Sequence, residues 1–156
     1  MITRSAEETR KLGVRLAREL RAGDILLLEG DLGAGKSELA RGVARGLGVK
    51  EYVTSPSFTI LNVYHSGRLP LYHFDWYRLE SEEELYELGM DEYLGGDGVA
   101  LVEWPARCPD ALPERCLRIR LTPVGENGRD ISAEALGGFR EIDLEKMKRE
   151  NEDGEA

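Results

Sequence analysis

Eight consecutive residues have the types and spacing of a phosphate-binding loop. Residues 30–37 read GDLGAGKS and fit the pattern G-x-x-x-x-G-K-[ST]. Glycines permit backbone conformations that a side chain would block, so that several amide N–H groups can converge on one phosphate. Lys36 would place a cation beside the β- and γ-phosphates, and the Ser37 hydroxyl would coordinate Mg²⁺. The pattern therefore predicts binding of a nucleoside triphosphate together with Mg²⁺.

The elements on either side of this loop are those that its chemistry needs. Residues 25–28 form a continuous apolar run, which is typical of a parallel strand that is buried on both faces. After the loop, Leu39, Val43 and Leu47 recur on one face of a helix that ends near Gly48. The partial positive charge at the start of this helix favours phosphate. We expect the nucleotide to contact the second half of the loop and the start of the helix, namely Gly33, Ala34, Gly35, Lys36, Ser37 and Glu38.

Glu38 occupies a position where many such loops have a small hydroxyl residue. A carboxylate about 5 Å from a phosphate charge costs roughly 3 kcal/mol at an effective dielectric constant of about 20. The side chain can avoid this cost by turning outward, and an acidic residue suits the first turn of a helix. We therefore predict that Glu38 weakens the affinity for nucleotide without abolishing it.

Two acidic residues end apolar extended segments elsewhere in the chain. Asp75 follows residues 71–74, and Glu103 follows residues 99–102. In an open α/β sheet, ligands bind at the carboxyl ends of the parallel strands, where both acids would lie. Phosphoryl chemistry needs a carboxylate for the metal and a group that orients the attacking water. The residues alone leave these two roles open between Asp75 and Glu103, and either acid taken alone could be a cap or turn residue.

The patterns that recognise guanine are missing from the sequence. There is no Asn-Lys-x-Asp stretch, and Asp75 does not begin an Asp-x-x-Gly segment. Their absence favours ATP as the nucleotide.

The remaining patterns predict how these groups are positioned. Ser5 and Glu8 form a capping box for a helix over 6–21, and residues 52–63 and 69–76 are predicted to be extended. A short acidic helix over 81–88, a buried strand over 99–102, and a strand over 116–121 that turns towards 129–133 follow. We predict an α/β fold with a mainly parallel sheet, flanking helices and an antiparallel addition late in the chain. One domain would cover residues 1–139, followed by a charged and partly disordered C-terminal tail over 140–156.

Composition and charge exclude several classes of protein. Of the 156 residues, 41% are hydrophobic and 33% are charged, as in a soluble globular domain. Apolar runs reach only four residues, as at 25–28, which is too short to span a bilayer, and the N-terminal MITRSAEETRK has no signal-peptide segment. We therefore expect a cytoplasmic protein without a membrane anchor. The net charge of −9 argues against a general nucleic-acid binder.

The charge is unevenly distributed along the chain. Residues 4–21 carry six basic and three acidic side chains, whereas residues 80–97 carry eight acidic and no basic ones. The two segments could be solvated faces of opposite sign, or surfaces that dock other macromolecules by complementary charge. The sequence leaves both interpretations open.

Five motifs in one order resemble the TsaE (YjeE) family, whose members are P-loop ATPases of bacterial tRNA threonylcarbamoyladenosine (t6A) biosynthesis. The motifs are GDLGAGK (30–36), VTSPSFTI (53–60), YHFDWYRL (72–79), ELGMDEYL (87–94) and VEWP (102–105), and the resemblance covers about residues 5–133. It implies a P-loop nucleotide-hydrolase fold with a mixed sheet. It also implies slow ATP hydrolysis by the chain alone and action with the partners TsaB and TsaD. TsaD would transfer the threonylcarbamoyl group to adenosine 37 of tRNA, and this chain would meet tRNA only indirectly, through the complex.

The resemblance also implies roles for individual residues. Ser37 and Glu103 would be Mg²⁺ ligands, Asp75 would lie beside the metal and the γ-phosphate, and residues 54–59 would act as a switch-like loop. Gly128-Arg129 resembles a late Gly-Arg of the family, which implies that Arg129 lies against the nucleotide. Together with Lys36, the two acids are the expected catalytic residues.

Two other functions use the same phosphate loop. A small-molecule kinase would place several arginines over the transferred phosphate, and no arginine cluster stands in the middle of this chain. A nucleotide-sensing module without hydrolysis would be consistent with Glu38. Outside these motifs, His73 is interpreted as a packed or hydrogen-bonded residue, and Trp76 and Trp104 as packing aromatics beside the site.

Overall fold

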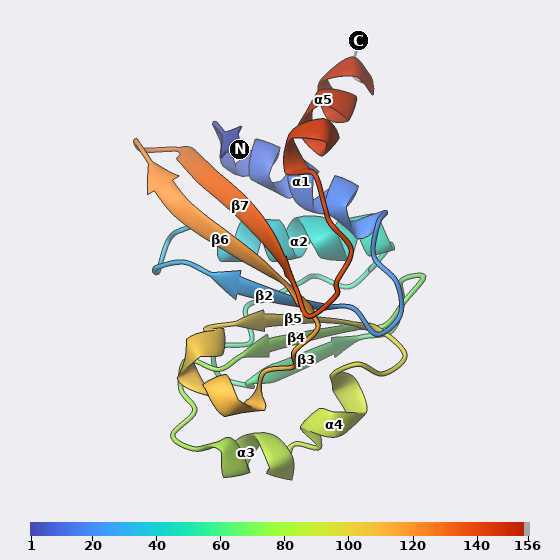
Figure 1. Cartoon of the computed structure of the whole chain (residues 1–156), viewed down its shortest axis with the longest axis vertical. Helices are drawn as coiled ribbons and strands as arrows, with labels where there is room; N and C mark the ends of the chain where they lie inside the picture. Colours follow the sequence, from blue (N-terminus) through green and yellow to red (C-terminus); the bar gives the residue numbers. More distant parts are fainter. Residues whose placement is uncertain (155–156) are drawn as a thin grey trace.

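One seven-stranded sheet lies between helices on its two faces in residues 1–154, which the computed structural model describes, with side chains described as far as residue 149 (Figure 1). The elements in chain order are β1 (Ile2–Thr3), α1 (Ala6–Ala17), β2 (Ile25–Glu29), α2 (Lys36–Leu47), β3 (Leu61–Tyr64), β4 (Leu71–Asp75), α3 (Glu82–Glu87), α4 (Met90–Tyr93), β5 (Val99–Glu103), the short 3₁₀ helices η1 (Pro105–Arg107) and η2 (Pro109–Ala111), β6 (Cys116–Val124), β7 (Gly128–Leu136) and α5 (Leu144–Gly154).

The sheet has the strand order β1-β7-β6-β2-β5-β4-β3. Its centre is parallel, from β6 through β2 and β5 to β4, and antiparallel strands extend it on both sides. The predicted mainly parallel sheet with a late antiparallel addition is confirmed, and β3 forms a second antiparallel edge. Because the parallel strands run in the same direction, the carboxyl ends of β2, β4 and β5 lie at one edge of the sheet.

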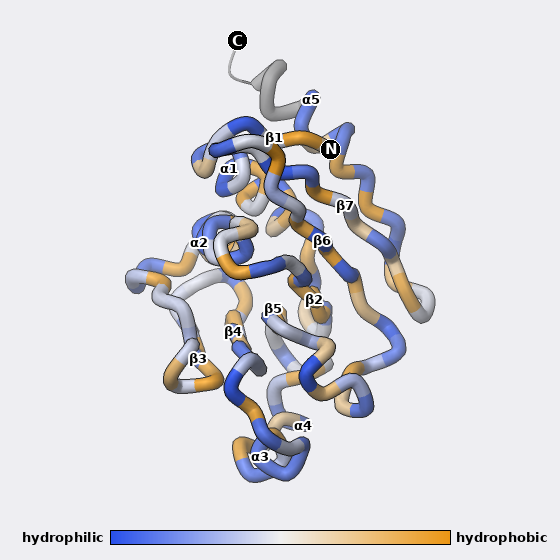
Figure 2. Tube along the Cα trace, turned by 90° about the vertical axis from the view of Figure 1, so that its left-hand side faces the viewer, coloured by the Kyte–Doolittle hydropathy of each residue, from blue (hydrophilic) through white to orange (hydrophobic). Residues whose placement is uncertain are grey.

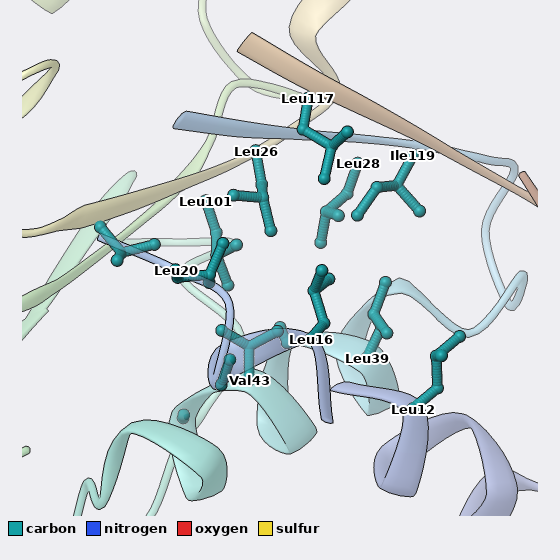
Figure 3. Close-up of a cluster of buried hydrophobic side chains, with 14 of the residues drawn as sticks. Leu12, Leu16, Leu20, Leu26, Leu28, Leu39, Val43, Leu101, Leu117 and Ile119 are labelled. Carbon is teal, nitrogen blue, oxygen red and sulfur yellow. The ribbon is translucent and has the colours of Figure 1, made fainter. Parts of the chain in front are cut away.

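The strand β2 is central because its side chains are apolar on both faces. Leu26 and Leu28 join the core beneath α1 and α2, whereas Ile25 and Leu27 join the core on the side of α3 and α4. Burying a leucine side chain contributes about 1.5–3 kcal/mol. Figure 3 shows the larger cluster, in which the strands contribute Leu26, Leu28, Leu101, Leu117 and Ile119, and the helices Leu12, Leu16, Leu39 and Val43.

The helices α1 and α2 touch each other backbone to backbone. A methyl group added at Gly42 of α2 would lie 2.1 Å from the carbonyl oxygen of Arg10, and one added at Gly13 of α1 would lie 2.6 Å from that of Leu39. Glycine at these positions therefore allows the two helices to approach more closely than any side chain would permit. This contact holds α2, whose first turn borders the phosphate loop, firmly against α1.

The helix α1 is shorter than its sequence pattern predicts. Ser5 caps it as expected, because its Oγ accepts a hydrogen bond from the N–H of Glu8 (3.1 Å). The helix ends at Ala17 instead of residue 21, since the next three N–H groups bond to carbonyls three residues back, in the tighter 3₁₀ manner. Leu20 is still buried in the core, which explains why the apolar period continues past the helix.

The predicted extended stretch over 52–63 is mostly irregular. Only its end joins β3, which begins at Leu61. Just before the strand, Ile60 has a φ of +67°, an unusual value for a β-branched residue. The N–H of Ile60 donates to the carbonyl of Pro56 (2.9 Å), and its own carbonyl accepts from the N–H of Asp75 (2.8 Å). These bonds turn the chain where the sequence pattern predicts a continuous strand.

The charged segment after residue 140 contains the helix α5, which the sequence pattern does not predict. Asp143 precedes the helix and accepts the N–H of Lys146 at Oδ1 (3.1 Å). Leu144 and Met147 of this helix are buried in the larger core, so the packed structure extends past the predicted boundary at residue 139. Residues 155–156 lie outside the described residues, and disorder there stays a prediction.

Hydrophobic residues gather on the inner strands, whereas α3 is largely hydrophilic (Figure 2). Within the part of the chain that the structure describes, no helix has the length and apolar character that crossing a membrane requires.

Candidate nucleotide-binding site

The phosphate-loop sequence lies between the end of β2 and the start of α2, as its pattern predicts. Gly35 is the last residue before α2 and has a φ of +100°, a left-handed conformation that side chains disfavour. Its carbonyl accepts the hydrogen bond of the Leu39 N–H (3.1 Å), which starts the helix. The N–H groups of the first helical turn have no partner within the helix and are available to an anion.

A cavity of about 380 Å³ adjoins this loop and collects residues from distant parts of the chain. All nine residues that the sequence predicts for the site line it, namely Gly33, Ala34, Gly35, Lys36, Ser37, Glu38, Asp75, Glu103 and Arg129. Ala6, Leu32, Ser55, Ser57 and Trp104 complete the lining. The fold thus brings the predicted residues together at the carboxyl edge of the parallel strands, while their roles stay predictions.

Lys36 is the buried cation of the cavity. Its Nζ donates to the carbonyl of Gly30 (2.6 Å) and lies 3.5 Å from the centre of the Trp104 ring. Burial lowers the pKa of the Lys36 ammonium group, although the negative charges of Glu103 and Asp75 oppose this shift. A cation beside two carboxylates and an aromatic face is held in place before any phosphate arrives.

Asp75 and Glu103 face each other across neighbouring strands. The two are register partners of β4 and β5, and they are only 7% and 4% exposed. One oxygen of each is fixed, since Asp75 Oδ1 accepts the N–H of Tyr77 (2.9 Å) and Glu103 Oε2 is 2.7 Å from Nε2 of His73. The second oxygen of each makes no hydrogen bond to another described residue. Asp75 therefore serves as a turn residue and is also available to the cavity.

The charge of Asp75 is compensated only in part by its surroundings, which include Lys36. Burial raises the pKa of Asp75 above its ordinary value, and the neighbouring Glu103 adds to the shift, whereas the N–H of Tyr77 opposes it. A cation bound between the two acids would relieve both effects.

The oxygens at this edge suit Mg²⁺. This ion prefers hard oxygen ligands and is held in proteins by one or two carboxylates together with substrate phosphates. The Ser37 hydroxyl, Asp75 and Glu103 form such a set at the start of α2 and the ends of β4 and β5. The described residues contain no group of three His, Cys, Asp or Glu that could hold a metal alone.

Arg129 reaches the phosphate loop from β7, which lies between β1 and β6 in the sheet. It lies on β7, and its Nη2 donates to the carbonyl of Gly33 (2.8 Å). Its buried Nε has no hydrogen-bond partner among the described residues and lies near Gly35. The Gly-Arg pattern thus places a cation against the loop, with one donor left unpaired.

Glu38 lines the cavity and forms ion pairs with two arginines. Its Oε1 is 3.0 Å from Nη1 of Arg41, and its Oε2 is 3.2 Å from Nε of Arg10 on α1. These charges offset much of the repulsion that an unpaired carboxylate would exert on a phosphate. The predicted weakening of nucleotide affinity is therefore expected to be smaller than the sequence alone indicates.

The loop over 54–59 lies beside the cavity and is held at its ends by β3. Asn62 accepts a hydrogen bond from Thr59 Oγ1 at its Oδ1 (2.7 Å) and donates from Nδ2 to the carbonyl of Thr54 (3.3 Å). Ser55 and Ser57, whose hydroxyls are 2.8 Å apart, line the cavity. The loop therefore presents hydroxyl groups to the cavity, as the predicted switch-like segment would require.

Sequence reasoning missed two contacts and one lining residue. The sequence suggested that His73 is hydrogen-bonded but not that its partner is Glu103, and Trp104 contacts Lys36 in addition to packing. The alternation in YHFDWYRL places His73 and Asp75 on one face of β4, which was a usable signal. Ala6 lines the cavity from the start of α1, and no pattern in the sequence indicated it.

Comparison with known proteins identifies the family of this chain. The family model "Threonylcarbamoyl adenosine biosynthesis protein TsaE" matches residues 3–131. The tRNA threonylcarbamoyladenosine biosynthesis protein TsaE of Bacillus subtilis is 44% identical over 94% of this chain and 92% of its own length. The Treponema pallidum protein of the same name is 43% identical over 84% of this chain and 96% of its own.

A solved structure has the same architecture. The crystal structure of Bacillus subtilis YdiB superposes with a TM-score of 0.78 at 38% identity, covering 100% of this chain and 95% of that one. The chain therefore belongs to the TsaE family, the tRNA threonylcarbamoyladenosine biosynthesis proteins.

Proposed function

We propose that this chain binds Mg-ATP and hydrolyses it as a component of the tRNA t6A machinery, together with TsaB and TsaD, in the cytoplasm. The observation that carries the proposal is the single cavity that joins Lys36 and Ser37 to Asp75 and Glu103. A phosphate loop alone would support nucleotide binding. The addition of two buried carboxylates at the same edge supports hydrolysis as well.

Each residue has a role that its position supports. The start of α2, Gly35 and Lys36 bind the phosphate chain, and Arg129 adds positive charge beside Gly33. Ser37, Asp75 and Glu103 would hold Mg²⁺, whose charge neutralises the phosphate oxygens. The carboxylate oxygen that the metal does not use would orient the attacking water. Burial of both acids keeps bulk water from competing for these oxygens.

The two alternatives have less support from the site. Arg129 is the one arginine among the described residues that line the cavity, whereas a kinase would use several over the transferred phosphate. The idea of a sensor without hydrolysis was motivated by Glu38, and its charge is paired with Arg10 and Arg41. Product analysis separates the three functions, since phosphate is released to water, transferred to an acceptor, or not released.

The proposal is tested first at the level of binding. Titration calorimetry with Mg-ATP should detect binding to the wild-type chain, and Lys36→Ala should weaken it about 100-fold or more, because a charged donor to the phosphates is lost. Lys50→Ala removes an exposed lysine beyond the end of α2 and serves as the matched control. Equal binding by the Lys36→Ala and wild-type chains would contradict the assigned site.

Hydrolysis is then measured with and without the partner proteins. Phosphate release should be slow for the chain alone and faster with TsaB and TsaD, and t6A formation on tRNA over many turnovers should require the chain. Rapid hydrolysis that ignores both partners would argue against the proposed role, even if ATP binds.

A further inference from the structure

His73 is a buried polar residue to which the proposed hydrolysis assigns no role. It lies in the middle of β4 and is 1% exposed. Its Nε2 is 2.7 Å from Oε2 of Glu103, and Glu103 is itself only 4% exposed. The contact joins β4 to β5, which are parallel neighbours in the sheet. A hydrogen bond between two buried side chains restricts the orientation of both.

The ring nitrogens show how this hydrogen bond is made. The carboxylate oxygen can only accept, so Nε2 of His73 carries the hydrogen and donates it. The other nitrogen, Nδ1, is buried and has no hydrogen-bond partner in the described part of the chain. A hydrogen on Nδ1 would be a buried donor without an acceptor, which proteins avoid. In this arrangement Nε2 of His73 donates the hydrogen bond to Oε2 of Glu103.

This bond determines which oxygen of Glu103 is available to the cavity. Oε2 is occupied by His73, whereas Oε1 makes no hydrogen bond to another described residue. A free glutamate side chain has several rotamers, and fixing it in one of them costs conformational entropy. The hydrogen bond from His73, on the neighbouring strand, fixes the Glu103 side chain when the protein folds. The loss of conformational entropy therefore occurs on folding and not when the metal binds. The alternation of β4 also places His73 and Asp75 on the same face as Glu103.

We propose that His73 is a positioning residue that orients Glu103 so that Oε1 is presented to the Mg²⁺ of the proposed ATP site. The inference rests on the proposed function, since it concerns the same site. Hydrogen bonds from a second layer of residues to metal ligands typically change metal affinity by about 10- to 100-fold when they are removed. His73 would act through Glu103 and would not touch the nucleotide.

Three variants separate positioning from packing. His73→Leu introduces an apolar side chain of similar bulk and removes the hydrogen-bond donor. His73→Gln keeps an amide N–H that can reach about the place of Nε2. Tyr72→Phe is the neighbouring control. The buried Tyr72 side chain lies on the opposite face of β4 from His73, and the substitution removes its hydrogen bond to Asp97 without changing a residue of the site.

The main measurement is the affinity of Mn²⁺ for the ADP-bound full chain, followed by electron paramagnetic resonance. We expect His73→Leu to weaken it about 10- to 100-fold, and His73→Gln to stay within about threefold of wild type. Calorimetry with ADP in the presence of EDTA should give equal nucleotide affinity for all variants. In hydrolysis assays with TsaB and TsaD, His73→Leu should lower kcat and raise the Mg²⁺ concentration needed, with little change in the KM for ATP.

The outcomes separate this inference from the proposed function. Wild-type Mn²⁺ affinity in His73→Leu overturns the positioning role alone. Equal losses in His73→Leu and His73→Gln, accompanied by equal drops in Tm, also overturn it, since the residue would then act only by packing. A wild-type chain that binds no Mn-ADP overturns both the proposed function and the role of His73.

Discussion

Asp24 and Asp75 are both buried aspartates next to strands of the same sheet, yet their surroundings differ. Asp24 precedes β2 at the amino edge and is 1% exposed, and Asp75 ends β4 at the carboxyl edge and is 7% exposed. Asp24 accepts hydrogen bonds from Arg140 (2.7 and 3.2 Å) and from the N–H of Arg21 (2.8 Å), with Arg115 3.5 Å away. Asp75 accepts one, from a backbone N–H.

The pKa values of the two groups shift in opposite directions. Burial by itself raises the pKa of Asp24, but the hydrogen bonds from Arg140 and from the N–H of Arg21 outweigh it and lower the pKa. At Asp75, burial and the nearby Glu103 raise the pKa. The protein compensates one carboxylate fully and the other only in part. Removing one member of a fully paired buried set destabilises the fold, whereas a carboxylate that is only partly compensated is available to a bound cation.

The largest expected effect is on ATP hydrolysis and comes from the carboxyl edge, where Asp75 and Glu103 lie. Glu103→Gln should reduce ATP hydrolysis with TsaB and TsaD about 100-fold, because an anionic oxygen is lost beside the metal site. The free energy of unfolding should stay the same or rise, since glutamine still accepts from His73 and its repulsion of Asp75 is gone. Phosphate-release assays and chemical denaturation provide the two measurements.

Glu87→Gln on the exposed surface of α3 is the matched control for this change and should leave both quantities unchanged. A marked loss of stability in Glu103→Gln would show that this edge is structural, like the edge that holds Asp24.

The opposite result is expected at the compensated edge. Asp24→Asn should lower the free energy of unfolding by about 3 kcal/mol at neutral pH, because Arg140 and Arg115 lose a buried partner. Hydrolysis by the folded chain should be retained, since Asp24 lies at the other edge of the sheet. Urea denaturation and phosphate release measure the two effects, and a variant of wild-type stability would contradict the assignment.

The pH dependence of this difference has a definite sign. Because the pKa of Asp24 is lowered on folding, its stabilisation is present above the pKa in the unfolded chain, about 4, and is lost as the pH falls through the lower folded-state pKa. The gap in stability between wild type and Asp24→Asn should therefore be constant from about pH 5 to 7 and shrink in more acidic solution. A gap that grows in acid would contradict this account.

The smallest effect is expected at Glu38, which lies beside the nucleotide site but is compensated by arginines. Glu38→Thr should tighten ATP binding about fivefold, which corresponds to roughly 1 kcal/mol and is less than an unpaired carboxylate would cost. Calorimetry measures the affinity. Arg10→Ala removes one compensating charge and should weaken ATP binding. Identical affinities in wild type, Glu38→Thr and Arg10→Ala would show that the charge of Glu38 does not affect nucleotide binding.

The sequence predicted the phosphate loop well because its requirements are local. The strand, the glycines, Lys36 and the helix start are contiguous, so their pattern determines their geometry. Asp75 and Glu103 were found because they follow buried strands, and parallel strands bring such residues together.

Contacts between distant segments were not predictable from the sequence. The pairing of His73 with Glu103 depends on strand register, and the two arginine side chains that pair with Asp24 lie more than ninety positions away in the sequence. The helix α5 was missed because its few apolar residues stand among many charges, and its packing, rather than its composition, stabilises it.

The backbone contact between α1 and α2 limits how this chain can change during evolution. Leucines of the core can be exchanged for other apolar residues of similar volume, since neighbouring side chains rotate to fill the space. At Gly42 the obstacle is the carbonyl oxygen of Arg10, which would lie 2.1 Å from an added Cβ atom. Because this oxygen belongs to the backbone, no side-chain rotation can remove it. Any larger residue there would have to displace a whole helix, and with it the amide groups that border the phosphate loop. A saturation library should therefore accept glycine almost alone at this buried position, although Gly42 itself does not line the cavity.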